Sequence, residues 1–208
     1  MQIFGDYQLT VLGLTETWHD TDSPVFGRCR MAGFSVVDRP RVRVRDDLSV
    51  NHGGVAIVAA PGTLLSPLPT GSPSSTFEVV AAHMTGGRSR AAIAVVYRPG
   101  SQPVTAQFFD DLSALLERLV VLRLPLFVTG DFNVRLDHDT HHAEQLRSVF
   151  EAFGRDLRIV FLRSNRITNR IGRPIRFRIE FSNRIGRIYQ RIFNPFHRYL
   201  LCICHERE

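Results

Sequence analysis

Short apolar runs that stop at polar or turn-forming residues recur along the first three quarters of the chain. Runs of this length and punctuation are typical of buried β-strands. We therefore predict strands over residues 11–18, 34–37, 55–60, 77–83, 91–96 and 126–133. The segment rich in Pro, Ser and Gly at 66–75 predicts an exposed loop, and residues 84–90 predict a hairpin with a longer turn.

Two segments have the three-and-four spacing of a helix with one buried face. The first follows Pro103, ends before Pro125, and carries Phe108, Leu112, Leu115, Leu116 and Leu119. The second covers 140–153, with Gly154 as its end, and carries Leu146, Val149, Phe150 and Phe153. Strands that alternate with helices predict an α/β fold.

The composition changes after Gly154. Residues 155–208 carry 13 arginines and four acidic residues, a net charge of +9, whereas the preceding part has a net charge of −3. Near copies of an Asn-Arg-Ile pattern recur there and fit neither a regular helix nor a normal sheet. We therefore predict a domain over 1–154 and an Arg-rich tail over 155–208, either a nucleic-acid-binding arm or a non-homologous, poorly ordered segment from another reading frame or exon.

Cysteine content and hydropathy bear on the compartment. Three cysteines are too few and of the wrong parity for a disulfide framework, which favours a reducing environment. The sequence has neither the pattern of a secretory leader nor about 18 consecutive apolar residues. We expect a nuclear or cytoplasmic protein that does not bind membranes.

Residues that could take part in catalysis or metal binding lie at the ends of the predicted strands. Glu16, Tyr97 and the pair Asp131 and Asn133 each follow an apolar run. Asp131 offers an acceptor for a proton or a metal ion, and Asn133 points to the same side if the strand continues. Taken alone, Gly-Asp-Phe-Asn is also typical of a plain turn.

Alternating arginines at positions 39, 41, 43 and 45 would place four guanidinium groups on one face of an extended segment. An exposed edge or loop is the favoured interpretation, ahead of a contact with DNA.

Four motifs occur in a fixed order: Leu-Thr-Glu-Thr-Trp at 14–18, Gly-Gly-Val-Ala at 53–56, Val-Tyr-Arg-Pro at 96–99 and Gly-Asp-Phe-Asn at 130–133. Together they resemble the exonuclease/endonuclease/phosphatase superfamily, and most of all the endonuclease domain of non-LTR (LINE-type) retrotransposons. The resemblance covers roughly residues 11 to 154. It implies part of a four-layer α/β sandwich, in which helices flank two mixed β-sheets.

The resemblance also implies an activity and its residues. It implies a DNA endonuclease that hydrolyses phosphodiester bonds with Mg²⁺ or Mn²⁺. Glu16 resembles the metal-binding carboxylate and Tyr97 the tyrosine that contacts the scissile phosphate. Asp131 and Asn133 resemble the pair that orients the attacking water and the phosphate.

The sequence also departs from the pattern of the superfamily. No asparagine-bearing strand precedes Glu16, and no Ser-Asp-His motif follows residue 154, so we expect a domain truncated at both ends. One alternative is therefore a catalytically inactive remnant that acts at most as an Arg-rich nucleic-acid-binding protein. Another is a different hydrolase of the superfamily, such as an inositol-phosphate phosphatase or an RNA exonuclease.

Overall fold

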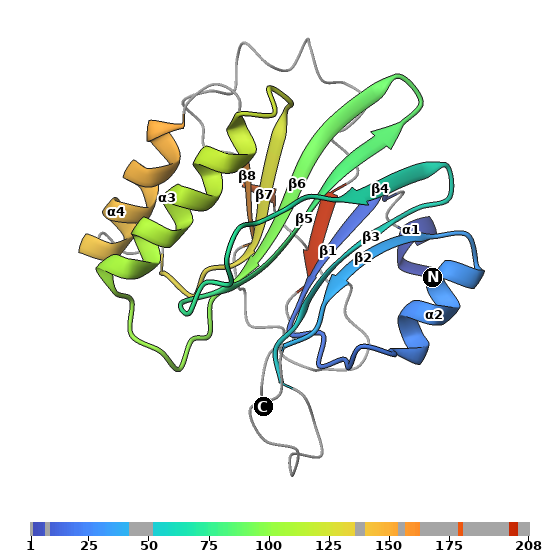
Figure 1. The fold of residues 1–208 in the computed structure, drawn as a ribbon, viewed down its shortest axis with the longest axis horizontal. Helices are drawn as coiled ribbons and strands as arrows, with labels where there is room; N and C mark the ends of the chain where they lie inside the picture. Colours follow the sequence, from blue (N-terminus) through green and yellow to red (C-terminus); the bar gives the residue numbers. More distant parts are fainter. Residues whose placement is uncertain are drawn as a thin grey trace.

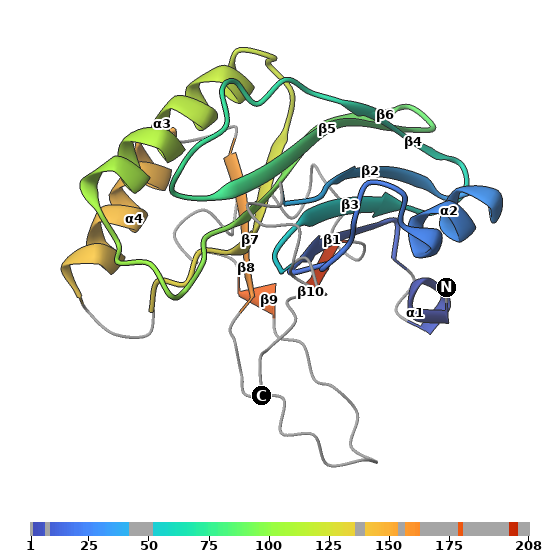
Figure 2. The same cartoon turned by 60° about the horizontal axis from the view of Figure 1, so that its bottom comes forward.

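Two β-sheets face each other, and helices cover the outer face of each sheet (Figures 1 and 2). The computed structural model describes residues 2–6, 9–41, 52–135 and 140–153 with their side chains, and three later strands by their backbone. The predicted α/β class and the four-layer arrangement with two mixed sheets are confirmed.

The smaller sheet has the strand order β10-β1-β3-β2. Its members are β1 (Val11–Thr15), β2 (Ser35–Arg39), β3 (Val55–Ala59) and β10 (Leu200–Ile203). Strand β1 runs parallel to β10 and antiparallel to β3, with Thr15 opposite Val55. This register places the residue after β1 beside the start of β3.

The larger sheet has the order β4-β5-β6-β7-β8-β9. Its members are β4 (Thr63–Pro67), β5 (Glu78–Gly86), β6 (Ser89–Tyr97), β7 (Leu126–Asp131), β8 (Leu157–Leu162) and β9 (Ile179–Glu180). Strands β6, β7 and β8 are parallel, and the other pairs are antiparallel. Because β6 and β7 are parallel, their carboxyl ends lie at the same rim of the sheet.

Three apolar layers hold the sheets and helices together. Helices α3 (Ala106–Val120) and α4 (His141–Ala152) pack on the larger sheet through a core that includes Phe108, Leu112 and Leu146. Helices α1 (Gln2–Asp6) and α2 (Pro24–Met31) cover the smaller sheet through Phe4 and Phe26 (Figure 2). Strand residues of both sheets, among them Ile57, Ile93 and Val95, fill the middle layer.

Both predicted helices are confirmed. The predicted apolar residues of α3 are buried, and those of α4 face the same core. Thr140 caps α4 through a hydrogen bond from the Ala143 amide to its hydroxyl oxygen, at 3.2 Å. Both helices therefore stand where their apolar periodicity placed them.

Several local predictions were wrong. The longer hairpin turn is in fact a two-residue turn, Gly87 and Arg88, because β5 and β6 pair as far as Gly86 and Ser89. Strand β4 enters the predicted loop at 66–75 and pairs with β5. Helix α2 was not predicted, although Ser23 before Pro24 is a typical helix start.

The alternating arginines are only partly an exposed edge. Strand β2 is the edge of its sheet, but Arg39 and Arg41 are half-buried and reach the larger sheet. Arg39 donates to the Val79 carbonyl at 3.3 Å, and Arg41 pairs with Glu78. Positions 43 and 45 lie outside the described residues.

Beyond residue 154, the described backbone consists of β8, β9 and β10, which extend both sheets. The division into a domain over 1–154 and a tail over 155–208 stays a prediction. Among the helices in the described part of the chain, none combines the length and apolar character that a membrane span requires.

A substitution at Gly130 tests how closely β6 and β7 approach each other. Its φ is +135°, and an added Cβ would lie 1.8 Å from the Val96 carbonyl oxygen. We predict that Gly130→Ala lowers the free energy of unfolding by about 2–5 kcal/mol, through backbone strain and overlap. Urea denaturation measures this loss.

The matched control is Gly27→Ala in α2, where an added Cβ meets no atom within 4 Å. We expect it to stabilise the protein by about 0.5–1 kcal/mol, because alanine favours the helix. Equal effects of the two substitutions would contradict the close approach at Gly130.

Candidate active site

Three polar side chains form a row across the larger sheet. Glu78 on β5 lies opposite Tyr97 on β6, and Tyr97 lies beside Asp131 on β7. Residues in register on neighbouring strands point to the same face, and Tyr97 belongs to the core between the sheets. The row therefore faces the smaller sheet at the rim where β6 and β7 end.

Glu16 meets this row from the opposite sheet. It follows β1, and its Oε1 accepts a hydrogen bond from the Tyr97 hydroxyl. Its Oε2 is buried and has no hydrogen-bond partner among the described residues. The structure thus brings together Glu16, Tyr97 and Asp131, three of the four predicted site residues.

The turn after β1 is held in an unusual conformation. Glu16 has a φ of +51°, which a non-glycine residue seldom adopts without support. Main-chain hydrogen bonds from the Thr17 and Trp18 amides to the Gly54 and Gly53 carbonyls, at 3.2 and 2.8 Å, supply that support. The predicted strand over 11–18 therefore ends at Thr15, because the chain turns at Glu16.

Gly54 couples this turn to Glu78. A Cβ on Gly54 would lie 2.7 Å from the Thr17 hydroxyl oxygen, and its φ of +86° also favours glycine. The Gly54 amide donates to Glu78 Oε2 at 2.6 Å. One glycine therefore contacts the Glu16 turn on one side and the polar row on the other.

A chain of side-chain hydrogen bonds also stabilises the turn that follows β1. The Thr17 hydroxyl lies 2.6 Å from His19 Nδ1, and His19 Nε2 lies 3.1 Å from Asp38 Oδ2. Arg30 of α2 donates to Asp38 Oδ1 at 2.5 Å. Because His19 is buried, these contacts fix the residues that follow Glu16 rather than form a second open site.

The segment after β7 is a turn, not a continued strand. Asn133 has a φ of +49°, and its amide donates to Asp131 Oδ1 at 2.9 Å. The strand does not continue to Asn133, so of the two interpretations of Gly-Asp-Phe-Asn the turn describes this segment. One N–H of its side-chain amide donates to the Arg98 carbonyl at 2.7 Å, which ties the turn to the end of β6.

Arg98 organises this turn through main-chain carbonyls. Its side chain is buried, and it donates to the Phe132 carbonyl at 2.7 Å and the Asn133 carbonyl at 2.6 Å. It also donates to the Pro99 carbonyl at 3.2 Å and the Gln102 carbonyl at 2.7 Å. Burial lowers the pKa of the guanidinium, and the nearby Asp131 carboxylate opposes that shift.

The protonation of the row follows from burial and mutual charge. Burial raises the pKa of Asp131 and the Glu16 charge adds to the rise, while hydrogen bonds from Asn133 and the charge of Arg98 oppose it. Burial also raises the pKa of Tyr97, and its hydrogen bond to Glu16 adds to that effect. Tyr97 is therefore a neutral hydrogen-bond donor at physiological pH.

The donor set fits a hard divalent cation. Mg²⁺ is usually held by one or two carboxylates, with water and substrate phosphate completing its coordination. The buried Oε2 of Glu16 offers one such oxygen. Within the described ranges no three His, Cys, Asp or Glu side chains form a cluster that could hold a metal by protein ligands alone.

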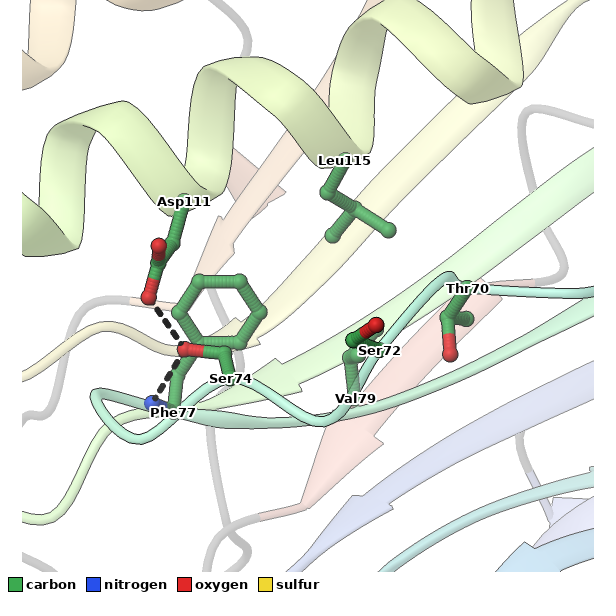
Figure 3. A pocket seen from close by; sticks show the side chains of 7 residues that line it. All are labelled: Thr70, Ser72, Ser74, Phe77, Val79, Asp111 and Leu115. Atoms are coloured by element: carbon green, nitrogen blue, oxygen red, sulfur yellow. Dashed lines mark hydrogen bonds between the residues drawn. The ribbon is translucent and has the colours of Figure 1, made fainter.

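A cavity of about 70 Å³ lies on the other face of the larger sheet, between the 70–77 segment and α3 (Figure 3). Its polar centre is Asp111, which accepts hydrogen bonds from Ser74, Thr76 and Gln107 at 2.6–2.9 Å. These bonds outweigh the effect of burial and lower the Asp111 pKa. Asp111 thus anchors the segment and does not belong to the polar row.

Sequence reasoning missed the supporting residues. Glu78, His19 and Arg98 lie in segments where nothing in spacing or composition marks their partners. The adjacency of Glu78 to Tyr97 depends on the β5–β6 register, which the assumed longer turn obscured. Arg98 stood within a quoted motif, but its four carbonyl acceptors come together only in the folded chain.

Comparisons with known proteins identify a family and several solved structures that this chain resembles. The model of the Endonuclease/Exonuclease/phosphatase family matches residues 1–179. A search of curated proteins gives no significant match. Among solved structures, the human Nocturnin catalytic domain with bound sulfate is similar, with 20% identity, a TM-score of 0.50, and coverage of 73% of this chain and 59% of that one.

Two further structures are similar. The 3′ phosphatase NExo from Neisseria, bound to a product DNA hairpin, has 19% identity, a TM-score of 0.50, and coverage of 72% and 63%. The endonuclease domain of TRAS1, a telomere-specific non-LTR retrotransposon, has 12% identity, a TM-score of 0.46, and coverage of 70% and 72%. The chain thus spans about three fifths of the length of Nocturnin and NExo, and its likeness to these two structures concerns the fold.

The raised pKa of Asp131 predicts a stability effect with a defined sign. The folded state binds this proton more tightly than the unfolded chain, so stability falls as pH rises from about 3.9 through the folded value. We predict that Asp131→Asn raises the free energy of unfolding at pH 7 in EDTA, and that the gain shrinks towards pH 4. Urea unfolding across this range measures it.

Asp131→Ala is the control, because alanine removes both the charge and the acceptor of the Asn133 amide. A wild-type protein more stable than Asp131→Asn at pH 7 would show that the charge is stabilising, contrary to this assignment.

Proposed function

The chain belongs to the endonuclease/exonuclease/phosphatase family, and from this membership we propose that it hydrolyses phosphodiester bonds in DNA with Mg²⁺ or Mn²⁺. One observation carries the proposal. Glu16 from one sheet meets Tyr97 and the neighbouring Asp131 from the other, so an acceptor for a cation, a neutral donor and a base lie at one rim. Metal-assisted hydrolysis of a phosphodiester uses these three kinds of group.

Asp131 is the proposed general base. It would accept a proton from the attacking water, a step worth typically 10²–10⁴-fold. Its raised pKa favours this role, because a carboxylate with a higher pKa is a stronger base.

Tyr97 is the proposed ligand of the scissile phosphate. Its neutral hydroxyl can donate to a phosphoryl oxygen without adding negative charge. In the structure this hydroxyl donates to Glu16, which fixes its position at the rim. Because a hydroxyl has a single proton, it would exchange this acceptor for a phosphoryl oxygen when substrate binds.

Glu16 is the proposed holder of the divalent cation, with its buried Oε2 as the available ligand atom. When bound, the cation supplies Lewis-acid stabilisation of negative charge on phosphate oxygens. The other oxygen of Glu16, Oε1, accepts the hydrogen bond that positions the Tyr97 hydroxyl in the structure.

Asn133 is proposed to help orient water and phosphate from the turn after β7. One of its amide N–H groups holds the Arg98 carbonyl, which leaves the second as the donor for this role. Gly100 makes room for it, because a Cβ there would lie 2.9 Å from Asn133 Oδ1. Arg98 donates hydrogen bonds to the Phe132 and Asn133 carbonyls and thus fixes the position of this turn relative to the end of β6.

We further propose the non-LTR retrotransposon type of DNA endonuclease, acting in the nucleus or cytoplasm. The order of the four motifs supports this assignment over an inositol-phosphate phosphatase or an RNA exonuclease. The Arg-rich composition after residue 154 supports an additional, non-specific contact with nucleic acid.

A plasmid-nicking assay with and without Mg²⁺ tests the proposal. We predict metal-dependent nicking that Asp131→Ala reduces by about 10²–10⁴-fold, because the variant lacks the base. The matched control is Asp110→Ala, which removes an exposed carboxylate of α3 on the opposite face of the sheet and should leave the rate unchanged.

Equal nicking by the wild type and Asp131→Ala, or none by either, would refute the enzyme assignment. Salt-dependent DNA binding without any nicking would instead support the alternative, an inactive Arg-rich nucleic-acid-binding protein.

A further inference from the structure

We propose that His19 is a positioning residue for the divalent cation, because it links Thr17 to Asp38 and so holds Glu16 in the conformation that binds the metal. The proposal rests on the proposed function, in which Glu16 is the cation-binding carboxylate. His19 is 7% exposed, so it acts through other residues and not by contact with the substrate.

The conformation of Glu16 requires support from outside the turn. Glu16 and Trp18 have φ values of +51° and +48°. Such conformations are costly for residues with a Cβ and persist only where the surroundings determine them. Thr17 lies between these two residues, so a contact that fixes its side chain acts on both. The main-chain bonds to Gly53 and Gly54 fix the same turn through its backbone.

His19 connects the side chain of this turn to strand β2. The Thr17 hydroxyl oxygen lies 2.6 Å from His19 Nδ1, and His19 Nε2 lies 3.1 Å from Asp38 Oδ2. Asp38 lies within β2, opposite Ala56 of β3. An imidazole bonded at both nitrogens has a fixed orientation. The ring therefore transmits the position of the sheet to Thr17.

Helix α2 and Gly54 hold the imidazole and its partner in place. The His19 ring lies 4.8 Å from the Phe26 ring, edge to face at 84°. Arg30 donates to the second oxygen of Asp38 at 2.5 Å. An added Cβ on Gly54 would lie 3.1 Å from His19 Nδ1, so a glycine there leaves room for the ring. The relay is thus packed on one side by a helix and on the other by a strand end.

The free oxygen of the carboxylate makes the turn decisive for metal binding. Glu16 Oε1 accepts from Tyr97, whereas Oε2 has no hydrogen-bond partner among the described residues. The direction of Oε2 therefore depends on the backbone of the turn and on the single bond at Oε1. Groups that orient a metal ligand from behind typically contribute about 10–100-fold to metal affinity. We assign such a contribution to the link between Thr17 and His19.

Titration of the full chain with Mn²⁺ tests this assignment without an activity measurement. Trp18 is the only tryptophan of the chain, so quenching of its fluorescence by Mn²⁺ reports binding two residues from Glu16. We expect Thr17→Val and His19→Gln each to weaken Mn²⁺ binding by about 10-fold. The double variant should bind no more weakly than either single one, because both substitutions remove the same hydrogen bond.

Thr17→Ser is the matched control, because serine keeps the hydroxyl, and it should bind Mn²⁺ as the wild type does. Thr140→Ala removes the cap of α4, on the outer face of the larger sheet. It should lower the urea midpoint but leave the affinity unchanged, which separates positioning from a general loss of stability.

Two different results would overturn the proposal. Wild-type affinity in both Thr17→Val and His19→Gln would refute the positioning role and leave Glu16 as the cation-binding residue. If the wild type did not bind Mn²⁺, or if Glu16→Gln bound it equally well, the cation assignment itself would fail and this proposal with it.

Discussion

The hydrogen bond between Tyr97 and Glu16 joins the two sheets at the site, beside the contacts of Glu78 with Gly54 and Arg41. Tyr97 ends a strand of the larger sheet and Glu16 follows a strand of the smaller one. The bond therefore has the right geometry only if the apolar layer between the sheets sets their separation. Because interiors are close-packed, the side chains of this layer set that separation. The middle core is thus the spacer between the two halves of the candidate site.

Two of the four predicted site residues have left-handed backbone conformations, Glu16 at +51° and Asn133 at +49°. Such conformations cost about 1–3 kcal/mol each and persist only where the surroundings determine them. Around Glu16 the support comes from Gly53 and Gly54, and around Asn133 it comes from Arg98. Both turns are therefore held in place before any substrate binds. The raised pKa of Asp131 reflects a similar cost to stability. Burial of this carboxylate lowers the stability of the fold and makes Asp131 a stronger base.

The sequence was sufficient for features that arise from local periodicity. The helices around Leu112 and Leu146, the strands that end near Glu16 and Tyr97, and the α/β class all follow from apolar spacing. Features that depend on register were not predictable in this way. The row from Glu78 to Asp131 requires the two-residue turn at Gly87, and the longer turn assumed from the sequence would have shifted Glu78 away from Tyr97. The turn at Asn133 was one of two interpretations of Gly-Asp-Phe-Asn. The contacts that decide for it, those of the Asn133 side chain and of Arg98, exist only in the folded chain.

Burial, rather than charge count, separates the roles of the arginines. All 26 basic residues are arginines, and a net charge of +6 says little about which of them meet a substrate. Arg98 is buried, and its guanidinium donates hydrogen bonds to carbonyl oxygens. It therefore stabilises the conformation of the main chain. Arg41 has one side of its guanidinium on Glu78 and Gly53 and keeps a third of its side chain in solvent. The same residue type is thus enclosed at the end of β6 and partly exposed beyond the end of β2.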